Sequence, residues 1–114
     1  MSDLITSVEK ANKYSWGQGC VAWQLVNKTK FYVVEEVMPP TSAEIEHHHN
    51  LAQQFFYVLD GVATFYHDGK ELLVKAGEGI YIEPGIRHKV SNQSDNDLRM
   101  LIVSTPPSLN DRHE

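Results

Sequence analysis

The sequence contains a single cysteine, Cys20, among its 114 residues, which excludes an internal disulfide framework. It also lacks a long apolar run, and its hydrophobic stretches are far too short to cross a bilayer. The N-terminal segment has neither the basic start nor the apolar stretch of a secretory signal peptide. We therefore expect a cytoplasmic protein in which Cys20 stays reduced.

Positive charge is scarce as well. Ten Lys and Arg residues against fifteen Asp and Glu residues give a formal net charge of −5, and no basic stripe occurs. Binding to nucleic acid or to an anionic membrane depends on clustered Lys and Arg, so neither is expected as a partner. The composition indicates an acidic, soluble, globular chain, long enough for one domain with a buried core.

Helical periodicity is nearly absent from the sequence. Residues 2–13 could form one short helix capped by Ser2 or Asp3. Beyond Gly19, short β-rich runs alternate with turn residues, a pattern typical of a sandwich or barrel. Strands are expected near residues 21–27, 31–38, 43–49, 54–59, 63–66, 71–75, 80–82, 88–91 and 98–104.

Two dipeptides, Asp60-Gly61 and Asp68-Gly69, are the strongest hairpin signals, because both accept positive φ angles. The chain is thus expected to be all-β. It divides into an N-terminal arm (1–20), a barrel (21–105) and a C-terminal tail (106–114).

Three of the histidines have a spacing that favours convergence. His47 and His49 are two residues apart on an expected strand, so they project to the same side. His88 follows the rigid Pro84-Gly85 turn. Neutral imidazole nitrogens that converge in this way commonly hold a first-row transition metal. The remaining histidines, His48, His67 and His113, are expected to be structural or solvent-facing.

Two separate blocks of the sequence carry regularly spaced Gly, His and Asn residues. The first reads His47-x-His49, four residues, Gln54, six residues and Gly61. The second reads Gly77, five residues, Glu83-Pro84-Gly85, two residues, His88, three residues and Asn92. These blocks resemble the two signature motifs of the cupin superfamily. Other stretches, such as Tyr14-Ser15-Trp16-Gly17, resemble a group of small single-domain bacterial cupins that mostly lack an assigned reaction.

The resemblance implies a double-stranded β-helix (jelly-roll) barrel with one divalent transition metal per chain: Fe, Mn, Ni, Zn or Cu. The implied metal ligands are His47, His49, Gln54 and His88. The chain departs from the motifs at Thr41 (usually Gly), at Glu83 (usually Pro) and at Gln54 (usually a ligating Glu).

The amide at Gln54 brings no charge, so metal affinity should fall while the ion keeps more of its charge and polarises bound oxygens more strongly. Gln53 is the competing candidate for this ligand position, but only Gln54 gives the six-residue gap to Gly61.

Weaker hypotheses concern the surroundings of the metal. Glu36 could act as a catalytic base or orient a ligand histidine. Three aromatic residues, Trp23, Phe56 and Tyr81, could line an apolar pocket. Asp111 and Arg112 could hold the tail in place through an ion pair.

Three functions remain open from the sequence. The first is a metal-dependent enzyme of the dioxygenase, isomerase or lyase type that acts on a small oxygenated molecule. The second is a non-catalytic small-ligand-binding or sensor module, and the third is a scaffold whose metal site has been lost at Gln54. A homodimer is expected, with the N-terminal arm and strand 31–38 pairing across a two-fold axis.

Overall fold

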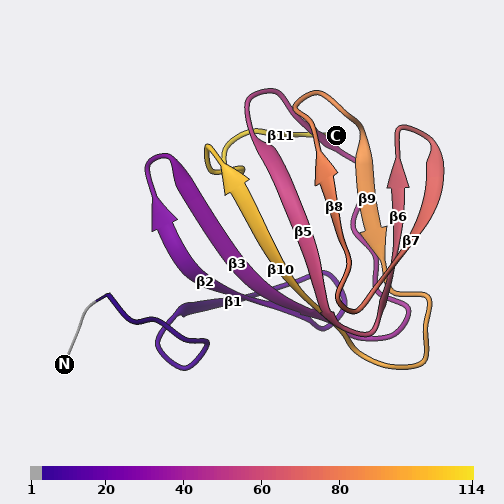
Figure 1. Ribbon diagram of the computed structural model, residues 1–114, viewed down its shortest axis with the longest axis horizontal. Helices are drawn as coiled ribbons and strands as arrows, with labels where there is room; N and C mark the ends of the chain where they lie inside the picture. The colour runs from indigo at the N-terminus through magenta and orange to yellow at the C-terminus, as the bar shows by residue number, and fades with distance from the viewer. Residues whose placement is uncertain (1–3) are drawn as a thin grey trace.

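The computed structural model describes residues 4–114, and every regular element in this range is a β-strand, which confirms the all-β prediction (Figure 1). The strands are β1 (Asn12–Trp16), β2 (Cys20–Lys28), β3 (Phe31–Met38), β4 (His48–His49), β5 (Gln53–Asp60), β6 (Val62–His67), β7 (Lys70–Lys75), β8 (Gly79–Ile82), β9 (His88–Ser91), β10 (Leu98–Thr105) and β11 (Arg112–His113). No helix able to span a membrane occurs among these residues.

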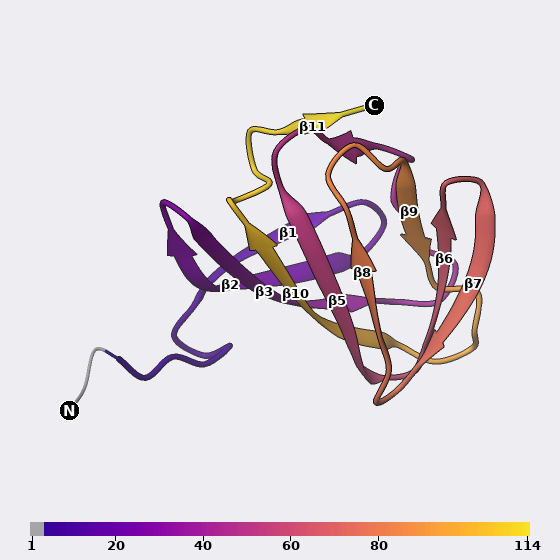
Figure 2. The ribbon, with the colours of Figure 1, turned by 45° about the horizontal axis from the view of Figure 1, so that its top comes forward.

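The strands form a large and a small antiparallel sheet around a shared hydrophobic core (Figure 2). The large sheet has the order β1-β2-β3-β10-β5-β8, and the small one has the order β7-β6-β9. A separate pair joins β11 to β4. Phe56 of β5 and Phe65 of β6 meet in the core with ring centroids 5.0 Å apart. The core therefore closes the space between the two sheets.

Alternation along the strands also places polar side chains inside the barrel. Successive residues of a strand face opposite sides of the sheet, and the buried face of β3, β5 and β10 includes Glu36, Gln54 and Ser104, respectively. These side chains lie on neighbouring strands, because β10 pairs with β3 on one side and with β5 on the other. In this register Ser104 lies opposite Gln54, whereas Glu36 lies opposite Met100, so Gln54 and Glu36 are separated along the interior of the barrel.

The helix expected over residues 2–13 does not form in the described part of that segment. Instead, β1 begins at Asn12 and pairs with β2, up to the partners Trp16 and Cys20. Such a short helix is marginal in isolation, whereas strand pairing satisfies the backbone of the arm against an existing sheet. The expected caps, Ser2 and Asp3, lie outside the described residues.

Of the two expected hairpins, one is confirmed. Asp68 (φ 51°) and Gly69 (φ 83°) form the two-residue turn between β6 and β7. Asp60-Gly61 is not a hairpin, because β5 and β6 belong to different sheets. Gly61 has φ 90°, and a Cβ there would lie 2.6 Å from the carbonyl oxygen of Asp97. This glycine therefore allows a tight crossing between the sheets.

The strand expected over 43–49 is regular only at His48–His49, while Ala43 and His47 form isolated bridges to β9. The expected two-fold contact through strand 31–38 is also wrong. Both edges of β3 are occupied, one by β2 and the other by β10. The strand at that end of the large sheet is β1. The homodimer itself stays a prediction.

Candidate metal centre

Three imidazoles meet inside the barrel. His47 and His88 lie opposite each other in an antiparallel bridge, where each backbone N–H donates to the other's carbonyl oxygen, at 3.0 and 2.8 Å. His49 lies in β4, and its carbonyl oxygen accepts the Gly85 N–H at 2.6 Å. The ring centroids are 4.5 to 5.5 Å apart, and one nitrogen from each ring lies within 4.8 Å of the others. The predicted convergence of the two blocks therefore occurs.

Backbone carbonyls fix the orientation of all three rings. Each Nδ1 lies within hydrogen-bond distance of a carbonyl oxygen, which can only accept, so each Nδ1 carries the proton. The acceptors are Ile45 for His47 (2.7 Å), Asp111 for His49 (3.0 Å) and Ile86 for His88 (2.8 Å). The Nε2 atoms are left with free lone pairs. Metal-bound histidines typically have this tautomer, because the ring nitrogen that does not bind the metal donates its N–H to a carbonyl or carboxylate oxygen.

Burial keeps these rings neutral. It lowers the pKa of His47 to about 3 and that of His88 to about 4, because a charged imidazolium would be poorly solvated there. The pKa of His49 is lowered for the same reason. All three rings therefore keep their Nε2 lone pairs at neutral pH.

Gln54 lies beside the histidines, whereas Gln53 faces outward. The Oε1 atom of Gln54 is 3.2 Å from His88 Nε2, and its Nε2 donates to Ser104 Oγ at 3.0 Å. Gln53 is exposed and bonds to Thr105 and Tyr81 on the outer face. Of the two amides, only Gln54 is placed to offer an oxygen to a metal held by the rings.

The donor set fits a divalent transition metal. The Nε2 atom of His49 is buried and has no hydrogen-bond partner among the described residues, which costs free energy unless something occupies that lone pair. In the orientation of the Gln54 amide, the Oε1 and His88 Nε2 lone pairs face each other, and a cation would stabilise that arrangement. Imidazole nitrogens suit Zn, Cu, Fe and Ni.

A cavity of about 170 Å³ reaches this histidine cluster at one end. His47, His49 and Gln54 line this end. The other lining residues are Tyr14, Tyr32, Val34, Glu36, Glu44, Phe56, Ile102, Ser104, Ser108, Leu109 and Arg112. The cavity is smaller than the roughly 300–1,000 Å³ typical of sites for drug-sized ligands. It therefore favours a small molecule.

Two carboxyl groups in this cavity have raised pKa values. Burial raises the pKa of Glu36 to about 8, and the neighbouring Glu44 adds to the shift. Burial also raises the pKa of Glu44 to about 7, against the opposing effects of Arg112 and of the Val90 N–H. Both groups can therefore hold a proton close to neutral pH.

The predicted pocket residues divide between the two faces of the sheet. Phe56 lines the cavity. Trp23 and Tyr81 do not: Trp23 stacks under the Arg99 guanidinium, with 5.6 Å to the ring centroid, and Tyr81 is half exposed and bonds to Gln53. The assignment of these two residues to the pocket is corrected accordingly, because strand alternation points both side chains away from the interior.

Sequence reasoning missed Glu44 and Arg112. On the strand expected over 43–49, Glu44 would face away from His47 and His49, but the irregular backbone there lets it line the same cavity. Arg112 comes from the tail, and the expected Asp111–Arg112 ion pair is absent from the described contacts. The Arg112 Nη2 donates instead to the Ile45 carbonyl oxygen at 3.1 Å. The tail therefore belongs to the cavity wall.

The fold and the site together define an all-β barrel with a buried three-histidine cluster that could hold a metal ion. The chain belongs to the Cupin_2 family, whose cupin domain model matches residues 33–104. It is 28% identical over 112 residues to the uncharacterised protein MJ1618 of Methanocaldococcus jannaschii, covering 94% of this chain and 90% of the relative.

Two further comparisons support the family and the fold. An oxalate-binding protein of Thermotoga maritima is 32% identical over 66 residues, which cover 58% of this chain and 54% of that protein. The crystal structure of an RmlC-like cupin from Shewanella frigidimarina superposes with a TM-score of 0.84 at 17% identity, covering 96% of both chains. The chain thus has the double-stranded β-helix fold of cupins.

Proposed function

We propose that this cupin is a metal-dependent enzyme that acts on a small oxygenated molecule, in the dioxygenase, isomerase or lyase class. The observation that carries the proposal is one small cavity with a three-histidine cluster at one end and two protonatable carboxyl groups at the other. A divalent Fe, Mn, Ni, Zn or Cu ion held by His47, His49, His88 and Gln54 would polarise an oxygen atom of the substrate.

Glu36 is the proposed proton carrier of the reaction. It is only 5% exposed and lines the same cavity as His47 and His49. Because burial raises its pKa to about 8, its carboxyl group can donate a proton near neutral pH and then take one back. Glu44 and Arg112, which line the same region, tune this proton affinity in opposite directions.

The size of the cavity and the name of one relative narrow the range of candidate substrates. A volume of about 170 Å³ supports a molecule of few atoms. The Thermotoga maritima relative is named for binding oxalate, a small oxygen-rich anion. Oxalate, keto acids, small diols and sugars therefore form the test panel.

The test combines metal reconstitution with one matched pair of variants. Protein without an affinity tag is loaded with Fe, Mn, Ni, Zn or Cu and assayed against the panel. Glu36→Gln should keep its metal but lose activity by about 10²–10⁴-fold, the usual contribution of a positioned acid or base. Glu35→Gln, which alters the neighbouring outward-facing carboxylate that pairs with Arg99, should retain activity. Absence of turnover with every metal would contradict the proposal.

A ligand-binding or sensor module is the second candidate, and the name of the oxalate-binding relative favours it. The same cavity would then anchor the ligand through the metal without converting it. Thermal-shift measurements separate the two functions: a compound that raises the Tm strongly but is recovered unchanged supports binding alone.

A further inference from the structure

The end of the chain folds back onto the strand that carries His49. β11 pairs with β4, so that Arg112 lies opposite His49 and His113 lies opposite His48. The imidazoles of His48 and His113 stack with centroids 5.3 Å apart. The two segments are far apart in sequence but adjacent at the same end of the barrel (Figure 2).

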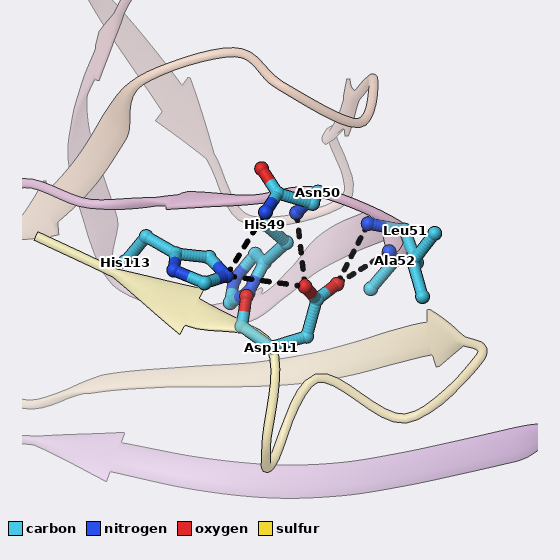
Figure 3. A network of polar contacts seen from close by, with 6 residues as sticks. All are labelled: His49, Asn50, Leu51, Ala52, Asp111 and His113. Atoms are coloured by element: carbon cyan, nitrogen blue, oxygen red, sulfur yellow. Dashed lines mark hydrogen bonds and ion pairs between the residues drawn. The ribbon is translucent and has the colours of Figure 1, made fainter.

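The Asp111 carboxylate holds the loop that follows His49 (Figure 3). Its Oδ1 accepts the backbone N–H of Asn50 at 3.1 Å, and its Oδ2 accepts those of Leu51 at 2.8 Å and Ala52 at 2.9 Å. Three consecutive backbone donors thus converge on one side chain. Hydrogen bonds to an ionised acceptor are roughly twice as strong as neutral ones, so this contact fixes the local path of the chain.

The backbone of Asp111 contacts His49 directly. Its carbonyl oxygen accepts the His49 Nδ1–H at 3.0 Å, which leaves the orphaned Nε2 of that ring facing the other histidines. One residue therefore sets both the ring orientation of His49, through its carbonyl, and the backbone after it, through its carboxylate.

His49 differs from the other two histidines in the origin of the carbonyl that accepts its Nδ1–H. His47 and His88 each bond to a carbonyl two residues earlier on their own segment, Ile45 and Ile86. His49 depends on a carbonyl 62 residues away. Two rings are thus positioned locally, and the third is positioned only when the tail is docked.

We infer that Asp111 is a positioning residue for His49, which makes the C-terminal segment an integral part of the metal site. The inference rests on the proposed function in that His49 is taken to be a metal ligand. It predicts that a change at Asp111 disturbs His49 selectively and leaves the locally held rings of His47 and His88 in place.

The experiment compares full-length Asp111→Ala and Asp111→Asn with Asp95→Ala, which alters an exposed loop carboxylate. In metal-free protein, long-range ¹H–¹⁵N spectra report the tautomer of each imidazole. We expect wild type to show Nδ1–H at all three rings and Asp111→Ala to lose the fixed tautomer of His49 alone. Asp111→Asn, which keeps one acceptor oxygen, should show a partial change and serves if the alanine variant unfolds.

Titration with Co²⁺ provides the second readout. We expect binding to weaken by about 10–100-fold in Asp111→Ala, the usual effect of removing a group that hydrogen-bonds to a metal ligand. The visible bands should shift in this variant, and Asp95→Ala should change neither property. A wild-type His49 tautomer in both Asp111 variants would overturn the inference. If wild type binds no Co²⁺, the proposed function fails, while the tautomer spectra still decide the role of Asp111.

Discussion

The two ends of the cavity keep buried ionisable groups neutral in opposite ways. At the histidine end, burial lowers the pKa values, and backbone carbonyls hold the Nδ1 protons so that the Nε2 lone pairs stay free. At the carboxylate end, burial raises the pKa values, so Glu36 keeps its proton up to about pH 8 and Glu44 up to about pH 7. One end thus offers electron pairs to a cation, and the other offers protons to a substrate.

The largest expected effect comes from removing a ring at the histidine end. His88→Ala should weaken Zn²⁺ binding by more than about 100-fold, because it removes a ring nitrogen that would bind the metal itself and not merely a group that orients a ligand. Metal content per chain and a competitive Zn²⁺ titration measure this effect. His67→Ala, a change at a half-buried histidine outside the cluster, is the control. Equal metal binding by the two variants would rule out His88 as a ligand.

Gln54→Glu tests how the uncharged amide at this position affects metal affinity and the stability of the metal-free protein. The added carboxylate should strengthen Zn²⁺ binding about 10–100-fold through direct Coulomb attraction. Without metal, the variant should be less stable than wild type, because a side chain that is 7% exposed would then carry a buried charge or a shifted proton. Gln53→Glu, on the outer face, should change neither quantity. Metal titration and urea unfolding of the metal-free proteins give both readouts.

The raised pKa of Glu36, at the carboxylate end, should make the free energy of unfolding depend on pH. The folded pKa of Glu36 is raised to about 8 from an ordinary value of 4.5, so the folded state holds an extra proton between these values. The free energy of unfolding should therefore fall as pH rises through this window, by at most about 1.4 kcal/mol per pH unit from this group.

The histidines make the free energy of unfolding rise with pH, but only below their ordinary pKa of 6.5. In that range the unfolded chain binds protons at these histidines, whereas the buried rings of the folded chain stay neutral. Between pH 7 and pH 8 the slope therefore comes mainly from Glu36, with a smaller contribution of the same sign from Glu44, whose pKa is raised to about 7. In urea unfolding, metal-free Glu36→Gln should lose most of this downward slope and should be more stable than wild type at pH 8, while Glu35→Gln keeps the slope. A flat wild-type profile would show that Glu36 is already ionised at pH 7.

The convergence of the three histidines could be predicted from the sequence because most of its determinants are local. Strand alternation orients His47 and His49 together, and the Pro84-Gly85 turn precedes His88. The carboxylate end could be predicted only at Glu36, which lies on the regular strand β3. Glu44 lies on irregular backbone that propensity does not describe, and the Asp111 carbonyl reaches His49 across 62 residues. Contacts of that kind follow from tertiary packing alone.

The smallest expected effect concerns Thr41, in the segment that leads from β3 to the histidines. Thr41 has φ 70°, a left-handed conformation that is costly for a β-branched residue, and cupin motifs usually have Gly at this position. Thr41→Gly should therefore raise the free energy of unfolding by about 0.5–1 kcal/mol, since relief of strain outweighs the greater chain entropy of glycine. Thr29→Gly, in the exposed turn after β2, should give no gain. Thermal unfolding of Thr41→Gly and Thr29→Gly measures whether the backbone at Thr41 is strained. A lower Tm for Thr41→Gly than for wild type would show that it is not.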